Sequence, residues 1–171
     1  MTILSIIDSH DKLSKKPAHK VNIRNAPPPN LGIIVKSLKH HMDNFKLDVI
    51  CASHIGVPLQ IALVRKWKKE DYVLLFNTTI VSTSVDKISF TEGSPFYVGL
   101  SIKISRPASC RARTTNINGI TSSASYESAE ARLLQIIDSV QKGISLITEA
   151  NYIERSRANK EWMALQRKNK K

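Results

Sequence analysis

The sequence predicts an α+β protein in which two amphipathic helices flank a series of antiparallel strands. Apolar side chains recur at helical spacing in residues 31–45 and again in residues 133–144. Between these segments the chain alternates apolar and polar side chains with the period of half-buried strands, as at Leu100, Ile102 and Ile104. Because helices do not alternate regularly with strands, the pattern excludes a parallel sheet built from βαβ units.

Length, composition and charge narrow the class of protein further. A chain of 171 residues fits one domain, and a hydrophobic content of 42% is enough for a core. No run approaches the 18 apolar residues of a membrane span, and the N-terminus lacks the basic start and cleavage site of a secretory signal. We therefore expect a soluble, intracellular protein. Its net charge of +12 predicts an acidic partner surface, or an assembly whose other chains neutralise the excess.

The first half of the chain reads as strand, helix and further strands. Residues 2–7 suit a short strand or an extended edge, and the three prolines at 27–29 exclude a helix that crosses them. Asn30 is a candidate N-cap for a helix that extends to about Lys46. Two short apolar runs in residues 49–64 then predict a strand, a turn and a second strand.

The second half predicts more strands, a second helix and a tail. Residues 72–82 continue the strand pattern, and the sequence NING at residues 116–119 is a hairpin turn signal. We expect the second helix to begin near Ser125 and to be disturbed at Gly143. From about Tyr152 the composition favours a helix, although its apolar stripe is poor.

Two cysteines and one nearby histidine are the first candidates for reactive groups. Neither Cys51 nor Cys110 belongs to a CxxC pair, so we expect two buried free thiols. His54 follows Cys51 by three residues, and on a strand that spacing places two side chains on opposite faces. We therefore expect a packed Cys51 and a polar or partly exposed His54 rather than a nucleophile and its base.

The order of the segments resembles the peptide deformylase family over residues 2–148. VICASH at residues 49–54 lies where that family has a Gly-Leu-Ala-Ala-Pro-Gln motif. EGSP at 92–95 is similar to its Glu-Gly-Cys-Leu-Ser motif, and ARLLQIIDSVQKG at 131–143 is similar to its helix ARxxQHExDHLxG. The resemblance implies antiparallel sheets around a central C-terminal helix in residues 1–148, followed by a basic, helical extension in residues 149–171.

The resemblance also assigns positions to the family's metal site. There a cysteine and the two histidines of HExxH bind a divalent metal, the intervening glutamate is the general base, and the glutamine stabilises the oxyanion. The matching positions here are Ser94 for the cysteine, Ile136 and Val140 for the histidines, Ile137 for the glutamate and His54 for the glutamine. A frame shifted by one residue replaces the histidines with Gln135 and Ser139 and rebuilds no site either. We therefore expect no metal, no cofactor and an apolar filling of the former metal cavity.

The C-terminal tail is a candidate docking arm. Seven of its residues are basic: Arg155, Arg157, Lys160, Arg167, Lys168, Lys170 and Lys171. We expect Trp162 to be exposed among them and to anchor the tail in a protein groove or on a nucleic-acid base. The deformylases that the chain resembles include bacterial members with a basic C-terminal helix that docks on the ribosome. The alternative is a solvated, frayed extension.

Together these features predict a catalytically inactive deformylase-like protein that serves as a structural or interaction subunit. Its partners would be protein subunits, with nucleic acid as a second possibility and with neither a membrane nor a small-molecule substrate. A phage virion, as a tail or baseplate part, is the first assembly we expect, because phage genomes carry deformylase-like genes. The alternatives are a ribosome- or RNA-associated factor that docks through its tail, and a divergent hydrolase with a rebuilt site.

Overall fold

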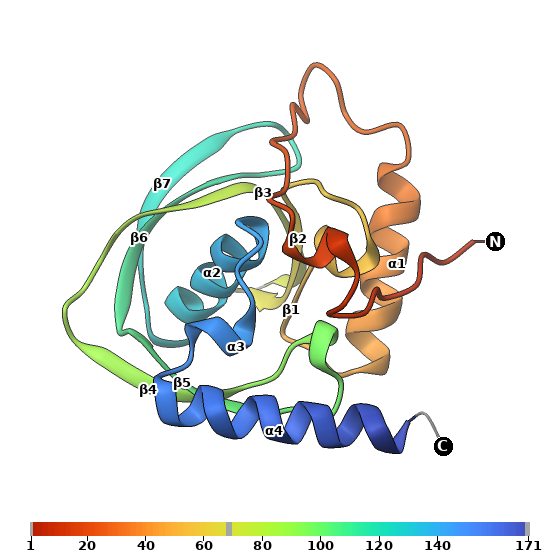
Figure 1. The fold of residues 1–171 in the computed structure, drawn as a ribbon. Helices are drawn as coiled ribbons and strands as arrows, with labels where there is room; N and C mark the ends of the chain where they lie inside the picture. Colours follow the sequence, from red (N-terminus) through yellow and green to blue (C-terminus); the bar gives the residue numbers. More distant parts are fainter. Residues whose placement is uncertain (1, 68–69, 170–171) are drawn as a thin grey trace.

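Two antiparallel sheets and a central helix form the molecule in a computed structural model that describes residues 2–67 and 70–169 (Figure 1). The helices are α1 (Leu31–Asn44), α2 (Ser128–Gln141), α3 (Leu146–Glu149) and α4 (Tyr152–Lys168), with short 3₁₀ turns η1 (Lys12–Lys15), η2 (Ala52–Ile55) and η3 (Pro95–Tyr97). The strands are β1 (Val49–Cys51), β2 (Ile61–Trp67), β3 (Glu70–Thr83), β4 (Lys87–Glu92), β5 (Ile102–Pro107), β6 (Ser109–Thr115) and β7 (Thr121–Glu127).

The larger sheet has five strands in the order β1-β2-β3-β6-β7, and β4 pairs with β5 in a separate two-stranded sheet. The α+β class and the antiparallel pairing are therefore confirmed. The hairpin predicted at residues 116–119 joins β6 to β7. Its Asn116 side chain accepts hydrogen bonds from the N–H groups of Asn118 and Ile120, both at 3.0 Å. Such bonds from an Asn side chain to the following backbone stabilise a tight turn.

Helix α2 is the element that the larger sheet surrounds (Figure 1). Leu134 and Ile137 are fully buried and pack with residues of β1, β2, β3 and β6. The expected start near Ser125 is wrong, because residues up to Glu127 continue as β7 and pair with β6. The helix ends before Gly143, whose φ is +73°. A Cβ there would lie 2.5 Å from the carbonyl oxygen of Lys15, so the chain requires glycine at this point.

The strand expected at residues 2–7 is also wrong. This segment runs beside α1 without joining a sheet. Side chains of α1 take the place of a neighbouring strand: the Leu4 N–H donates to the Ser37 hydroxyl at 3.0 Å, and the Leu4 carbonyl lies 2.7 Å from His41 Nε2. Asn30 occupies the N-cap position of α1 as expected.

The tail folds as the predicted helix, α4, but it does not project from the molecule. Its Trp162 was expected to be exposed and is instead buried, with its ring in an edge-on contact with the Tyr97 ring at 5.2 Å between centroids. Ala158 is also buried in the cluster that joins α4 to η3, β5 and α3. Lys170 and Lys171 lie outside the described residues. Among the described helices, none combines the length and apolar character that a membrane crossing needs.

A single asparagine ties the N-terminal segment to the larger sheet. Asn77 lies at an irregularity in the pairing of β3 with β6, where its φ is +52°. Its side-chain amide accepts from the Val21 N–H and donates to the Val21 carbonyl, each at 2.8 Å. Asparagine tolerates the left-handed region better than most residues with side chains. Asn77 therefore supplies both this backbone conformation and the two hydrogen bonds to Val21, which we call the clamp.

The clamp predicts a graded loss of stability. Asn77→Gly removes both hydrogen bonds but keeps the backbone conformation, and should lower the free energy of unfolding by about 1–3 kcal/mol. Asn77→Ala should lower it by about 1 kcal/mol more, because alanine is strained at positive φ. Urea denaturation of both variants measures the difference. Equal stability of the alanine variant and the unaltered chain would contradict the clamp.

Candidate functional site

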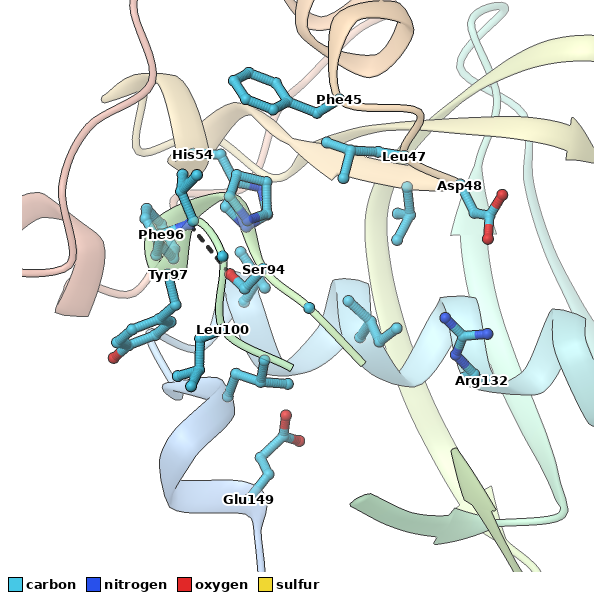
Figure 2. A pocket seen from close by; sticks show the side chains of 18 of the residues that line it. Phe45, Leu47, Asp48, His54, Ser94, Phe96, Tyr97, Leu100, Arg132 and Glu149 are labelled. Atoms are coloured by element: carbon cyan, nitrogen blue, oxygen red, sulfur yellow. Dashed lines mark hydrogen bonds between the residues drawn. The ribbon is translucent and has the colours of Figure 1, made fainter. Parts of the chain in front are cut away.

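A cleft of about 290 Å³ opens between α2, the loop that follows α1, and η3 (Figure 2). Its lining is mainly apolar and comes from five segments of the chain. The side chains that form its walls include Phe45, Leu47, Val49, Phe96, Val98, Leu100, Ile136, Val140, Ile144 and Leu146. Polar groups at its edge come from Asp48, His54, Ser94, Arg132 and Glu149.

The fold brings four of the five positions assigned to the metal site into this cleft. Ser94, His54, Ile136 and Val140 all line it. Ile137 does not: it is fully buried on the sheet side of α2, so its expected place in the former cavity is wrong. Successive helical residues differ by about 100° around the axis, which turns Ile137 away from its two partners.

The alignment shifted by one residue assigns positions that lie in another part of the molecule. Gln135, Asp138 and Ser139 line a second cavity of about 310 Å³, which also includes residues of β3 and β5. Ser94 and His54 do not belong to that cavity. The alignment without the one-residue shift is therefore the one that places the assigned positions, except Ile137, in the same cleft.

Ser94 has a structural role in η3. It occupies the N-cap position, where its hydroxyl oxygen accepts a hydrogen bond from the Phe96 N–H at 3.3 Å (Figure 2). Pro95 follows as the first residue of the 3₁₀ turn. A serine that caps a helical turn needs neither a base nor a metal to explain its place.

His54 is buried, contrary to the expectation of partial exposure. Its ring packs against the Phe96 ring at 4.5 Å between centroids, and its Nδ1 accepts the Cys51 N–H at 3.0 Å. Burial lowers the pKa of His54 to about 3, because the imidazolium would lose its hydration. The ring is therefore neutral and carries its proton on Nε2, which has no hydrogen-bond partner in the described part of the chain.

Cys51 does not form a reactive pair with this histidine. Its side chain is fully buried, as expected, and burial raises the pKa of the thiol to about 12. The two residues form a reciprocal capping box: the His54 ring accepts the Cys51 N–H, and the Cys51 side chain accepts the His54 N–H, so neither bond joins the sulfur to the ring. Because the thiolate is the nucleophilic form, a nucleophilic role for Cys51 has no support.

The donors around the cleft do not fit a divalent metal. The two positions on α2 carry isoleucine and valine, which have no lone pairs, and the hydroxyl of Ser94 is a weak neutral donor already used in η3. Within residues 2–67 and 70–169, no three His, Cys, Asp or Glu side chains gather into a group suited to a metal ion. The three positions that the resemblance assigns to metal ligands thus carry two aliphatic side chains and one serine.

A buried ionic cluster lies beside the cleft. Arg106 donates to both oxygens of Glu92 at 2.7 Å, and to both oxygens of Glu149 at 3.0 and 2.9 Å. Burial disfavours the charged form of Arg106, but the hydrogen bonds that Arg106 donates to the two carboxylates outweigh this effect and raise its pKa. Arg132 adds a second cation 3.3 Å from Glu92, and Ser139 donates to Glu149. The cluster joins the two-stranded sheet to α2 and α3.

Sequence reasoning recognised part of this cluster only as a pattern. Glu92 stands in the EGSP motif that resembles the deformylase family, but it was not assigned to a site. Glu149 follows the matched helix and carries no motif that would single it out. Its role arises only because α3 folds back toward β5.

The apolar walls of the cleft can accommodate an apolar group. Among the assigned positions, His54 is held neutral with its Nε2 shielded from solvent, and Ile136, Ile137 and Val140 carry no group that could accept a proton. Binding is therefore within the chemical capacity of this cleft, whereas activation of a water molecule by its assigned residues is not.

The buried histidine predicts a specific dependence of stability on pH. Because the pKa of His54 in the folded chain lies below the ordinary histidine value of about 6.5, the unfolded chain takes up this proton first as the pH falls. The contribution of the neutral histidine to the free energy of unfolding is complete above about pH 6.5 and should decline by about 1.4 kcal/mol per pH unit toward pH 3. Thermal denaturation between pH 7 and 5 should show a shallower loss in His54→Gln than in the unaltered chain. Parallel curves would contradict a neutral, buried His54.

The ionic cluster predicts a large effect of one substitution. Arg106→Leu leaves the buried Glu92 carboxylate without its main partner and should destabilise the fold by about 3–5 kcal/mol. Arg157→Leu on α4 is the matched control, because its ion pairs are exposed and should contribute far less. Chemical denaturation of both variants gives the comparison. An equal effect of the two substitutions would show that burial of the cluster is unimportant.

Comparison with known proteins gives a consistent result. The family described as polypeptide deformylase matches residues 3–156. No curated protein matches the chain significantly. Among solved structures, a plant peptide deformylase superposes with a TM-score of 0.85 at 20% identity, covering 99% of this chain and 92% of its own.

Two further structures span almost the whole of both chains. A peptide deformylase from Plasmodium falciparum has a TM-score of 0.84 at 20% identity and 97% coverage of each chain. One from Legionella pneumophila has a TM-score of 0.83 at 20% identity and 99% coverage of each. At such identities the likeness concerns the fold, while the match over residues 3–156 concerns the family. The chain belongs to the polypeptide deformylase family.

Proposed function

We propose that this member of the family has lost metal-dependent hydrolysis and serves as a structural or interaction subunit of a larger assembly. The supporting observation is the content of the cleft. Ser94, Ile136 and Val140 converge there at the assigned ligand positions, and their side chains cannot replace a thiolate and two imidazoles. The general-base position, Ile137, is turned into the core.

The burial of these side chains supports a change of role over a local rearrangement. Ile136 and Val140 are partly buried at the cleft, and Val140 also packs against the cluster that contains Leu146, so aliphatic side chains occupy the assigned ligand positions. Burial of an aliphatic side chain contributes about 1.5–3 kcal/mol when it is complete. This exchange favours stability where access of substrate and water to the site no longer matters. A divergent hydrolase with a rebuilt site would need a base and an activating group that the assigned positions do not supply.

A protein assembly is better supported than docking on RNA by the tail. Trp162 is buried in the domain and is not available to stack on a base. Arg155 donates to the carbonyls of Thr148 and Ala150, and Arg157 pairs with two glutamates of α4. A virion, as a tail or baseplate component, is the assembly we propose. The charge of +12 is the observation that favours the ribosome- or RNA-associated alternative.

Restoration of the ligands provides a direct test. The triple variant Ser94→Cys, Ile136→His, Val140→His should bind about one zinc ion, because a thiolate and two imidazoles then meet in the cleft. Ile137 is left unchanged, since a carboxylate at this fully buried position would be destabilising. The unaltered chain and Ser94→Cys alone should bind no metal in stoichiometric amount and should not hydrolyse a formyl-peptide.

Metal analysis by mass spectrometry and a deformylation assay read out the two parts of the test. Stoichiometric zinc, iron or nickel together with turnover in the unaltered chain would overturn the proposal. A triple variant that folds but binds no zinc would contradict the assignment of the three positions to one site.

A further inference from the structure

The edge of the larger sheet at β7 is exposed and regular. The strand order ends at β7, which pairs with β6 without a register shift from Ser109↔Glu127 to Thr115↔Thr121. Its main contacts are with β6 and α2, and Figure 1 shows it as a cyan strand at the periphery of the molecule. Proteins usually protect such an edge with lysine, proline, a bulge or a covering element. The seven residues TSSASYE contain neither lysine nor proline.

The free backbone groups of this edge can be identified from the hairpin. The Asn116 N–H bonds to the Ile120 carbonyl, and the Ser128 N–H bonds to the Ala108 carbonyl. Bonded and non-bonded pairs alternate along an antiparallel ladder, so every second residue of β7 bonds to β6. The remaining residues direct their N–H and C=O groups away from β6, at Thr121, Ser123, Ser125 and Glu127.

Two arginines lie on the same face as these residues. Arg111 is opposite Ser125 and Arg113 is opposite Ser123, and paired residues share one face of a sheet. Both arginines are exposed, and neither forms an ion pair with any residue in the described part of the chain. Arg111 already leans across β7, where its Nε lies 3.4 Å from the Ser123 hydroxyl. The small serine side chains leave room for both guanidinium groups to reach the edge.

We propose that β7 binds an extended, acidic segment of a partner protein as an added strand. Residues of the added strand opposite Ser123 and Ser125 would lie on the arginine face. Carboxylates at these alternate positions would meet Arg111 and Arg113, while the main chain bonds to the free groups of β7. A second copy of this chain fits less well, because paired β7 strands would bring like-charged arginines onto one shared face.

This inference names a partner for the interaction role proposed above and rests on it. The two can nevertheless fail separately. Loss of hydrolysis concerns the cleft, and strand addition concerns an edge to which none of the cleft residues belongs. The deformylation assay and a peptide-binding assay therefore report on different parts of the molecule.

The test uses the full chain and a fluorescent peptide, Thr-Glu-Val-Glu-Val-Glu-Thr, which matches the seven residues of β7. Binding by fluorescence anisotropy should weaken about tenfold in Ser125→Pro, because proline removes an outward N–H and leaves the bonds to β6 in place. Ser125→Ala is the matched control and should bind as the unaltered chain does. A peptide with lysine in place of glutamate should not bind.

A separate variant tests the role of the two arginines in peptide binding. Arg111→Glu with Arg113→Glu should weaken binding of the acidic peptide by at least about tenfold, and the unaltered chain should lose affinity between about 0.05 M and 0.5 M salt. This variant changes only exposed side chains, so it tests the proposal even if Ser125→Pro fails to fold. Circular dichroism verifies the folding of each variant.

Three results would overturn the proposal. The first is no binding of the acidic peptide, or binding that Ser125→Pro leaves unchanged while the variant remains folded. The second is a dimer of the chain alone that Ser125→Pro dissociates, which would make a second copy the occupant. The third is a single-stranded oligonucleotide that displaces the peptide and depends on the two arginines but not on Ser125→Pro.

Discussion

The burial of one face of α2 against the five-stranded sheet determines the rest of the architecture. Leu134 and Ile137 are fully excluded from water there, and complete burial of such side chains contributes about 1.5–3 kcal/mol each. With that face fixed, the helix can present only its other side to η3 and the loop after α1. Ile136 and Val140 lie on that side and line the cleft. The same helix therefore carries core positions and cleft positions in one short motif.

The ionic cluster connects this helix to the smaller sheet. Arg106 satisfies Glu92 and Glu149 with four hydrogen bonds, and Ser139 of α2 also reaches Glu149. Buried charges are stabilising only when their partners are complete, so the cluster favours one relative placement of β5, α2 and α3. Its Arg106, Arg132 and Glu149 also line the cleft.

Two surfaces can carry an interaction role, and they differ in kind. The cleft is mainly apolar, has a buried neutral histidine beside it, and includes four positions that the resemblance assigns to the family's metal site. The β7 edge is polar, unprotected and flanked by arginines, and it depends on backbone groups. The helix α4 was expected to be the interaction element, but it uses Trp162 and Ala158 to close the domain against η3 and β5. The helix nevertheless leaves Lys160, Arg167 and Lys168 exposed to solvent.

Local patterns in the sequence determined the presence of a helix from residue 31 and of a second helix that ends before Gly143, the hairpin at 116–119 and, through the resemblance, the family. These features depend on spacing within short segments, which is readable from side-chain type alone. Only the tertiary structure decided that His54 is buried, that Ile137 turns into the core and that Trp162 packs on Tyr97. It also decided that residues 2–7 bond to α1 and join no strand. Each of these outcomes depends on which distant segment covers the residue, and the sequence around a residue does not contain that information.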